Sequence, residues 1–335
     1  MKKIVNPLAD FDTPDPFMTY DADTGFYYAL FTRHDYIEIF RSRHAGVILR
    51  DGESKIIYVP DGEKDGIWGM IWAPEMHRGT NGKWYIYTSG LYDPEKWSKR
   101  LFIVESETSD PFGDWHFKCK PAPDMYAIDP TVYTHTDGRQ YICYSFVEGD
   151  LQTLEIRELE NPWTFGEKKA VIARAEYDWE LTEPYVGDKA INEGPFFIRN
   201  GDRLFIIYSA NGAFNAFYCL GVLEYTGGDL VSASSWIKHG SPLFTYGNGV
   251  YAPGHASFFR SPDGTELWCA YHAVKEYTET LVETERYMRL QRVEFDRNGY
   301  PVMGVPVPDG EELAPPSGEE EQTESRYKSG LPDII

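Results

Sequence analysis

Five polar residues with acid–base or metal-binding side chains recur along the chain at intervals of 54 to 64 residues; they are Asp15, Glu75, Asp129, Glu193 and His255. Carboxylates that lie together can serve as general acid and general base, because a like charge nearby raises the pKa of one of them. Like charges in one place are costly, and a purely structural protein would tend to use small or apolar side chains there. The recurrence therefore indicates a catalytic site.

The elements that must position these residues repeat with them. Each polar residue is followed by an apolar strand, a glycine-containing turn and a second strand rich in aromatic residues, expected at 26–32, 84–89, 141–145, 204–209 and 267–272. The turns are hairpin signals, and one or two further strands follow each hairpin. About four antiparallel strands per repeat, with almost no helical periodicity, predict an all-β fold, namely a five-bladed β-propeller.

The repeats predict one propeller catalytic domain over residues 1–305. Residues 306–335 are acidic and rich in proline, which predicts an extended or disordered tail. In a propeller the innermost strand of each blade lines the central channel, so residues at equivalent repeat positions form a ring. We therefore expect the five polar residues to meet at one end of the axis.

The charge of the chain limits its partners. The formal net charge is −21, and such a surface repels nucleic acid and anionic membranes, so neither is expected as a partner. A neutral ligand fits better, and the high aromatic content of 16% suits both strands and sugar-binding clefts. The sequence leaves the oligomeric state open.

The four cysteines form no CxxC pair, and Cys143, Cys219 and Cys269 lie inside apolar runs, which predicts reduced core residues. The chain begins without the apolar run of a signal peptide, and no segment is apolar enough to span a membrane. These features predict a cytoplasmic protein, or a secreted one if a leader has been removed.

Five motifs together resemble glycoside hydrolase family 43, in the order and spacing of that family over about residues 6–303. They are PDPFM at 14–18, IWAPE at 71–75, AIDPTV at 127–132, NEGPFF at 192–197 and APGHASFF at 252–259. The resemblance implies an inverting hydrolase that acts on arabinose or xylose glycosides of plant cell-wall polysaccharides or oligosaccharides.

The resemblance also implies roles for individual residues. Asp15 matches the general base that activates water, and Glu193 matches the general acid that protonates the leaving oxygen. Asp129 matches a third carboxylate that orients the acid and raises its pKa. His255 matches a histidine that helps to hold a calcium ion through water, with sodium as an alternative. No organic cofactor is expected.

Within the family, the motifs look most like those of exo-acting α-L-arabinofuranosidases that trim 1,5-linked arabinan. A β-xylosidase stays open as an alternative, because the choice of sugar depends on the shape of the pocket. A non-catalytic sugar-binding propeller is the other alternative, but it would be expected to lack at least one of the three carboxylates. Exo or endo action depends on loops such as 92–100 and 177–189, which are candidates to close one end of a cleft.

Three further residues are candidates for substrate binding. Trp72 is a candidate to stack on the sugar, with a core position as the alternative. Arg289 is a candidate to bind a furanose hydroxyl from the last repeat, and a surface ion pair is the alternative. Asn192 either positions Glu193 or contacts the sugar. Asp12 lacks the Pro-Phe that follows Asp15 and is placed outside the catalytic set.

Overall fold

The computed structural model describes residues 2–122, 124–181, 190–276 and 285–319, and most of these residues lie in β-strands. The all-β prediction is confirmed. The helical elements in the described part are single turns, namely α1 (Gly62–Asp65), η1 (Ala45–Val47), η2 (Asp178–Glu180) and η3 (Ala233–Ser235). None of the described helices has the length and apolar character needed to cross a membrane.

Twenty of the described strands form five consecutive antiparallel sets of four. The first set is β2 (Phe17–Asp21), β3 (Phe26–Leu30), β4 (Ile37–Ser42) and β5 (Glu53–Tyr58). The second set is β6 (Trp72–Arg78), β7 (Trp84–Asp93), β8 (Ser98–Ser106) and β9 (Trp115–Cys119). The third set is β10 (Ala127–Thr134), β11 (Gln140–Glu148), β12 (Leu151–Asn161) and β13 (Thr164–Ala173). The fourth set is β14 (Ala190–Asn200), β15 (Arg203–Ala210), β16 (Cys219–Tyr225) and β17 (Trp236–Lys238). The last is β18 (Tyr251–Arg260), β19 (Leu267–Val274), β20 (Tyr287–Phe295), β21 (Pro301–Val302).

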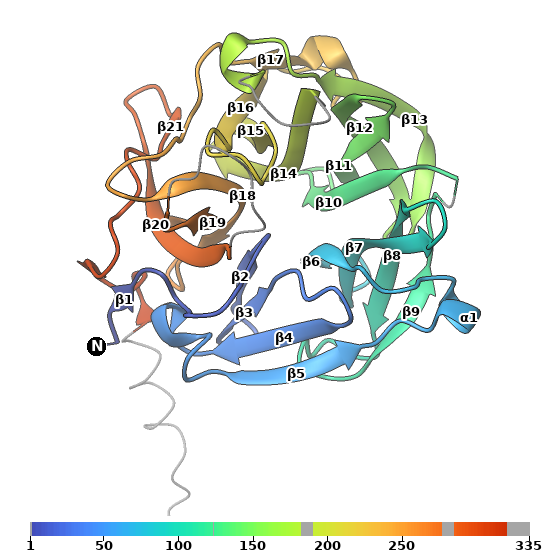
Figure 1. Cartoon of the computed structure of the whole chain (residues 1–335), viewed down its shortest axis with the longest axis horizontal. Helices are drawn as coiled ribbons and strands as arrows, with labels where there is room; N and C mark the ends of the chain where they lie inside the picture. The colour runs from blue at the N-terminus through green and yellow to red at the C-terminus, as the bar shows by residue number, and fades with distance from the viewer. Residues whose placement is uncertain (1, 123, 182–189, 277–284, 320–335) are drawn as a thin grey trace, which may run out of the picture.

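The predicted aromatic-rich strands are confirmed as β3, β7, β11, β15 and β19, the second strand of each set. The sets follow one another around a common centre, and the first strand of each set, β2, β6, β10, β14 or β18, lies nearest to it (Figure 1). A short parallel pairing of Leu151 and Gln152 on β12 with Ala190 and Ile191 on β14 joins the third set to the fourth.

A left-handed residue followed by proline lies within or just before each first strand. Asp15, Ala73, Asp129, Gly194 and Ala252 have φ values of 53°, 45°, 54°, 52° and 50°. In β6, β10, β14 and β18 the pairing with the neighbouring strand shifts at this point, as in a β-bulge. A bulge bends a strand and re-aims the side chains beside it.

This marker corrects the repeat alignment made from the sequence. Asp15 and Asp129 are equivalent, but Glu193 lies one residue before the marker of its strand. Glu75 and His255 lie two and three residues after theirs. Polarity and approximate spacing could not resolve offsets of one to three residues, whereas the backbone conformation does.

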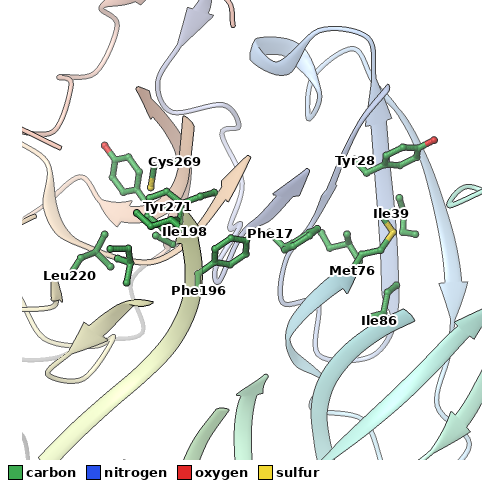
Figure 2. Packing of buried hydrophobic residues seen from close by; sticks show 14 of the residues in the cluster. Phe17, Tyr28, Ile39, Met76, Ile86, Phe196, Ile198, Leu220, Cys269 and Tyr271 are labelled. Carbon is green, nitrogen blue, oxygen red and sulfur yellow. The ribbon is translucent and has the colours of Figure 1, made fainter. Parts of the chain in front are cut away.

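Buried aromatic side chains fill the centre beneath the polar residues. Phe17 and Phe196 face each other across it with their ring centroids 6.3 Å apart (Figure 2). Phe258 packs against Phe196 at 5.7 Å. These rings belong to a buried cluster drawn from the first, second, fourth and fifth sets, which gives the polar end of the strands a rigid support.

The two ends of the described chain are joined by β1 (Ile4–Val5), which pairs with β22 (Glu312–Leu313). Nearby, the carboxylate of Glu319 is buried and accepts hydrogen bonds from the N–H of Ala45 and from His44. The predicted tail begins before this segment, and its residues 320–335 lie outside the described residues. The tail boundary at residue 306 stays a prediction.

Candidate active site

Four of the predicted residues lie together and buried at one end of the central strands. Ligand atoms of Asp129, Glu193 and His255 all lie within 4.8 Å of one another. Asp15 joins them, with its Oδ1 3.4 Å from Nδ1 of His255. Glu75 stands apart from this contact, because its carboxylate pairs with Nε2 of His77 at 2.8 Å.

Asp15 is surrounded by positive charge and hydrogen-bond donors. Nη1 of Arg286 lies 3.0 Å from Oδ1, and the hydroxyl of Thr32 donates to Oδ2 at 2.7 Å. Burial alone would raise the pKa of Asp15, but the charges of Arg286 and His255 outweigh it and hold the pKa below its usual range. Asp15 is therefore ionised at neutral pH.

The backbone of Asp15 is also held. Its N–H donates to Nδ1 of His272 at 3.0 Å, so that nitrogen carries no proton. Burial, followed by the charge of Arg286, lowers the pKa of His272 well below its usual value. A neutral His272 thus supplies the acceptor that keeps Asp15 in its left-handed conformation.

Glu193 has a different environment. The amide of Gln152 donates to its Oε2 at 2.7 Å, and the hydroxyl of Tyr218 lies 2.9 Å from its Oε1. The pairing of β12 with β14 brings Gln152 to this position. Burial raises the pKa of Glu193, and the charge of Asp15 adds to that effect. The carboxyl group is therefore suited to keep a proton near neutral pH.

Asp129 lies next to Glu193 and accepts a hydrogen bond from the N–H of Gly194 at 3.2 Å. Burial raises the pKa of Asp129 to about 7, with further contributions from the charges of Glu193 and Asp15. Because two buried carboxylates this close repel each other when both are ionised, Asp129 and Glu193 titrate as a pair that retains one proton.

His255 lies between the three carboxylates. Burial lowers the pKa of its imidazole, but Asp15, Asp129 and Glu193 outweigh burial and raise it. The neighbouring Gly194 is required here, because a Cβ at its φ of +52° would lie 3.2 Å from the imidazole ring. The three acids therefore favour the protonated form of this buried ring.

Polar residues at the ends of the second strands hold this site together. Thr32 donates to Asp15 and also accepts the N–H of Ala73 at 2.8 Å. Ser209 accepts the N–H of His255 at 2.8 Å, and Ser145 donates to the carbonyl of Asn192 at 3.0 Å. The sequence carried this signal, since four of the predicted aromatic strands end in serine or threonine and the fifth ends in His272.

The structure separates the candidates for substrate binding. Trp72 is partly exposed, and Nζ of the buried Lys99 lies 3.5 Å from its ring centroid. Burial lowers the pKa of Lys99 to about 7, and the charges of Asp129 and Asp15 act in the opposite direction. Trp72 therefore lies near the acids.

Asn192 and Arg289 point to other partners. Asn192 is buried and bonds to the ion pair of Glu180 and Lys238. Arg289 is also buried, and its Nη1 lies 2.5 Å from Oδ1 of Asp309. The arginine that contacts Asp15 is Arg286, which the sequence reasoning missed because both arginines belong to the same charged stretch.

The donor set does not fit a directly bound calcium ion. Ca²⁺ takes six to eight oxygen ligands, whereas the described cluster offers two carboxylates and one imidazole nitrogen. Direct binding by Glu193 would also displace the proton that an acid needs. A calcium or sodium ion held through water beside His255 stays a prediction, and no chemical step is assigned to it.

The same three carboxylates can perform acid–base chemistry without further groups. One is ionised and able to accept a proton from water, and a neighbouring pair retains a proton that it can donate. An acid and a base in contrasting protonation states at one buried site are what acid–base hydrolysis of a glycosidic bond requires.

Comparison with known proteins agrees with this chemistry. The profile of the glycosyl hydrolases family 43 matches residues 4–301. The chain is 33% identical to an extracellular exo-alpha-(1->5)-L-arabinofuranosidase of Streptomyces avermitilis, over 91% of this chain and 64% of that protein. It is 35% identical to an enzyme of the same name from Streptomyces chartreusis, over 82% of this chain and 84% of that protein.

Among solved structures, an alpha-L-arabinofuranosidase from Lactobacillus brevis is similar, with a TM-score of 0.82 and 26% identity. The match covers 92% of this chain and 98% of that one. The chain thus spans less than two thirds of the Streptomyces avermitilis relative but nearly the whole Lactobacillus brevis chain.

The predicted cytoplasmic location is wrong, because both Streptomyces relatives are named as extracellular enzymes, which points to secretion. The prediction relied on the absence of an apolar signal-peptide run at the start of the sequence and on unpaired cysteines. Cys143, Cys219 and Cys269 are indeed free, but they are buried, and burial raises the pKa of each thiol. Because a buried, protonated thiol resists oxidation in any compartment, it does not report location. The match along residues 4–301, together with these identities, shows that the chain belongs to glycosyl hydrolases family 43.

Proposed function

We propose that this protein is an inverting exo-hydrolase that releases L-arabinofuranose from α-1,5-linked arabinan or arabino-oligosaccharides. The observation that carries the proposal is the contrast between Asp15, kept ionised by Arg286, and Glu193, whose pKa is raised by burial. The names of the two Streptomyces relatives and of the Lactobacillus brevis structure support the choice of arabinofuranoside.

In the proposed reaction, Asp15 accepts a proton from a water molecule that attacks the anomeric carbon. Glu193 donates its proton to the glycosidic oxygen as that bond breaks, so that the products are arabinofuranose with inverted configuration and a free hydroxyl on the leaving group. Asp129 keeps the proton on the Asp129–Glu193 pair and holds the N–H of Gly194, which fixes the backbone beside Glu193. Gln152 and Tyr218 hold the Glu193 carboxyl group.

We propose that the five strand sets are the blades of a propeller whose catalytic domain ends near residue 305. Support comes from the four-stranded pairing of each set and from the arrangement of the first strands around one centre (Figure 1). The common left-handed residue before proline supports the same assignment, because it makes the sets equivalent by backbone geometry.

The test is hydrolysis of p-nitrophenyl α-L-arabinofuranoside, p-nitrophenyl β-D-xyloside and linear 1,5-arabinan, with product analysis. We expect arabinose as the first product from arabinan, and NMR taken early in the reaction should show the anomer of inverted configuration. Preference for the xyloside would overturn the sugar assignment, and early release of arabino-oligosaccharides would overturn exo action.

A further inference from the structure

A concave site lies between the second and third strand sets. This pocket has a volume of about 610 Å³, which falls in the range of ligand sites. Its lining includes Tyr126 and Phe146 together with the cations Arg100, Arg157 and Lys169. Nothing in the reaction proposed above uses these residues.

The pocket adjoins the catalytic cluster along two strands. Tyr126 directly precedes β10, which carries Asp129. Burial and the charge of Asp129 raise the pKa of Tyr126, whereas Arg100 lowers it, so the phenol feels both charges. On β11, Val147 lines the pocket and pairs with Gln152 of β12, whose amide bonds Glu193.

The positive charge of this pocket stands out on a chain with a net charge of −21. Arg157 and Lys169 share one carboxylate, that of Glu155, at 3.0 and 3.4 Å. The hydrogen bonds of Arg157 to other described residues come from its Nε and Nη2 rather than from Nη1, and the side chain of Lys169 is 50% exposed. Donors therefore remain for an anionic ligand.

One acidic residue opposes these cations. Asp124 also lines the pocket and is exposed. Removal of Asp124 should therefore strengthen anion binding, and removal of a cation should weaken it.

We propose that this pocket is a subsite on the leaving-group side that binds a carboxylated sugar, a uronic acid unit of the glycan to which the arabinofuranose or arabino-oligosaccharide is attached. Arginine and lysine donors would hold the carboxylate, and Tyr126 and Phe146 offer apolar faces for the sugar ring. The proposal rests on the proposed arabinofuranosidase activity, which it extends from the released sugar to the glycan that carried it.

The experiment compares kcat/KM for two substrates with the same terminal arabinofuranose. In one the leaving group is a disaccharide that contains a uronic acid, and in the other that unit is reduced to the neutral sugar. We expect Lys169→Gln to lower the acidic-to-neutral ratio about threefold, as for a partly exposed ion pair, and Asp124→Asn to raise it. Raising the salt concentration should lower the ratio of the wild type.

Lys168→Gln is the matched control, because Lys168 is a neighbouring exposed lysine that pairs with Asp229 instead. It should leave the ratio unchanged. NMR titration with D-glucuronate and D-glucose gives a second readout that needs no turnover, and only glucuronate should shift the signals of the pocket. A wild-type ratio of one, or equal effects of Lys168→Gln and Lys169→Gln, would overturn the subsite. Failure to hydrolyse p-nitrophenyl α-L-arabinofuranoside would instead overturn the proposed function.

Discussion

At the scale of single residues, three buried carboxylates of similar chemistry acquire different properties from their neighbours. Asp15 gains a guanidinium and a hydroxyl, whereas Glu193 gains an amide, a phenol and a second carboxylate. The different neighbours keep Asp15 ionised and favour a proton on the pair that Glu193 forms with Asp129. Substitutions that change one neighbour at a time should therefore change one protonation equilibrium at a time.

The acid and the base should respond differently to the leaving group. Asp15→Asn and Glu193→Gln should each lower kcat for arabinan by about 10²- to 10⁴-fold, the usual cost of losing general acid–base catalysis. Because a nitrophenolate needs little protonation, Glu193→Gln should keep relatively more activity on the aryl arabinofuranoside. Asp23→Asn, an exposed acid paired with Arg78, is the control. Near-normal turnover of arabinan by either variant would contradict the assignment.

Asp129 should set the alkaline limb of the pH profile. Asp129→Asn removes a negative charge beside Glu193, so the pKa of Glu193 should fall and its proton should be lost at lower pH. The alkaline limb of kcat/KM should therefore move to lower pH, with a fall in rate. If Asp129 only holds the backbone of Gly194, the thermal midpoint will fall and the limb will stay in place.

Arg286 should set the acid limb. Its charge helps to hold the pKa of Asp15 below the usual range, so Arg286→Gln should raise that pKa. The base would then be protonated at higher pH, and the acid limb of kcat/KM should move upward. Arg289→Gln is the matched control, because Arg289 pairs with Asp309 rather than with Asp15. The acid limb of the pH profile of this variant should not move. Equal shifts in both variants would show a general effect of charge.

At the scale of strands, a left-handed residue before proline lies within or just before each first strand, where such a bend re-aims the neighbouring side chains. Non-glycine residues adopt this conformation at a cost of about 1–2 kcal/mol. Polar groups at the ends of the second strands help to offset that cost by bonding the bent backbone, as His272 does for Asp15. The second strands are therefore part of the site, and their side chains act there through hydrogen bonds, as His272 does toward Asp15 and Ser209 toward His255.

Gly194 tests the role of this bend. Gly194→Ala should reduce the free energy of unfolding by more than the roughly 1–2 kcal/mol of a left-handed alanine, because its Cβ meets His255. It should also lower kcat. Gly201→Ala is the control, since Gly201 has a φ of +57° but no atom within 4 Å of the position that a Cβ would take. In urea unfolding, Gly201→Ala should lose only the free energy needed to place alanine in the left-handed conformation. Its activity should be normal. Equal decreases in the free energy of unfolding of the two variants would show that the contact with His255 does not contribute.

At the scale of the whole molecule, strands from both ends of the described chain pair beside the first set. β1 pairs with β22, and Glu319 binds Ala45 and His44. The acids lie on strands of the first, third and fourth sets, so their relative positions depend on how the sets are held together. The β1–β22 pairing and the hydrogen bonds of Glu319 do not involve the acids, so they should affect stability more than catalysis.

Glu319→Ala should reduce the free energy of unfolding by about 1–3 kcal/mol, because it leaves the buried N–H of Ala45 without its acceptor. Activity on the aryl arabinofuranoside should be unchanged at 25 °C. Glu312→Ala is the control, since Glu312 forms only an exposed ion pair with Lys3 and should cost less than about 0.5 kcal/mol. A comparable loss in both variants would show that burial of Glu319 contributes nothing.

The sequence alone determined the aromatic-rich strands, the all-β class and the family, because apolar and aromatic runs, hairpin turns and five motifs are local properties of the chain. It also indicated Asp15, Asp129 and Glu193, since each lies in a motif that repeats. No local motif indicated that β1 would pair with β22, or that Gln152, Tyr218 and Arg286 would contact the acids. Each reaches the site from an element distant in sequence from the acid that it contacts.

Only the tertiary structure decided how the acids differ and which arginine serves Asp15. A pKa depends on burial and on charges within a few ångströms, and spacing along the chain specifies neither. Arg286 and Arg289 are three residues apart, yet one contacts Asp15 and the other Asp309. The direction of a side chain from its strand made that choice, and strand direction is fixed by pairing across the sheet rather than by residue type.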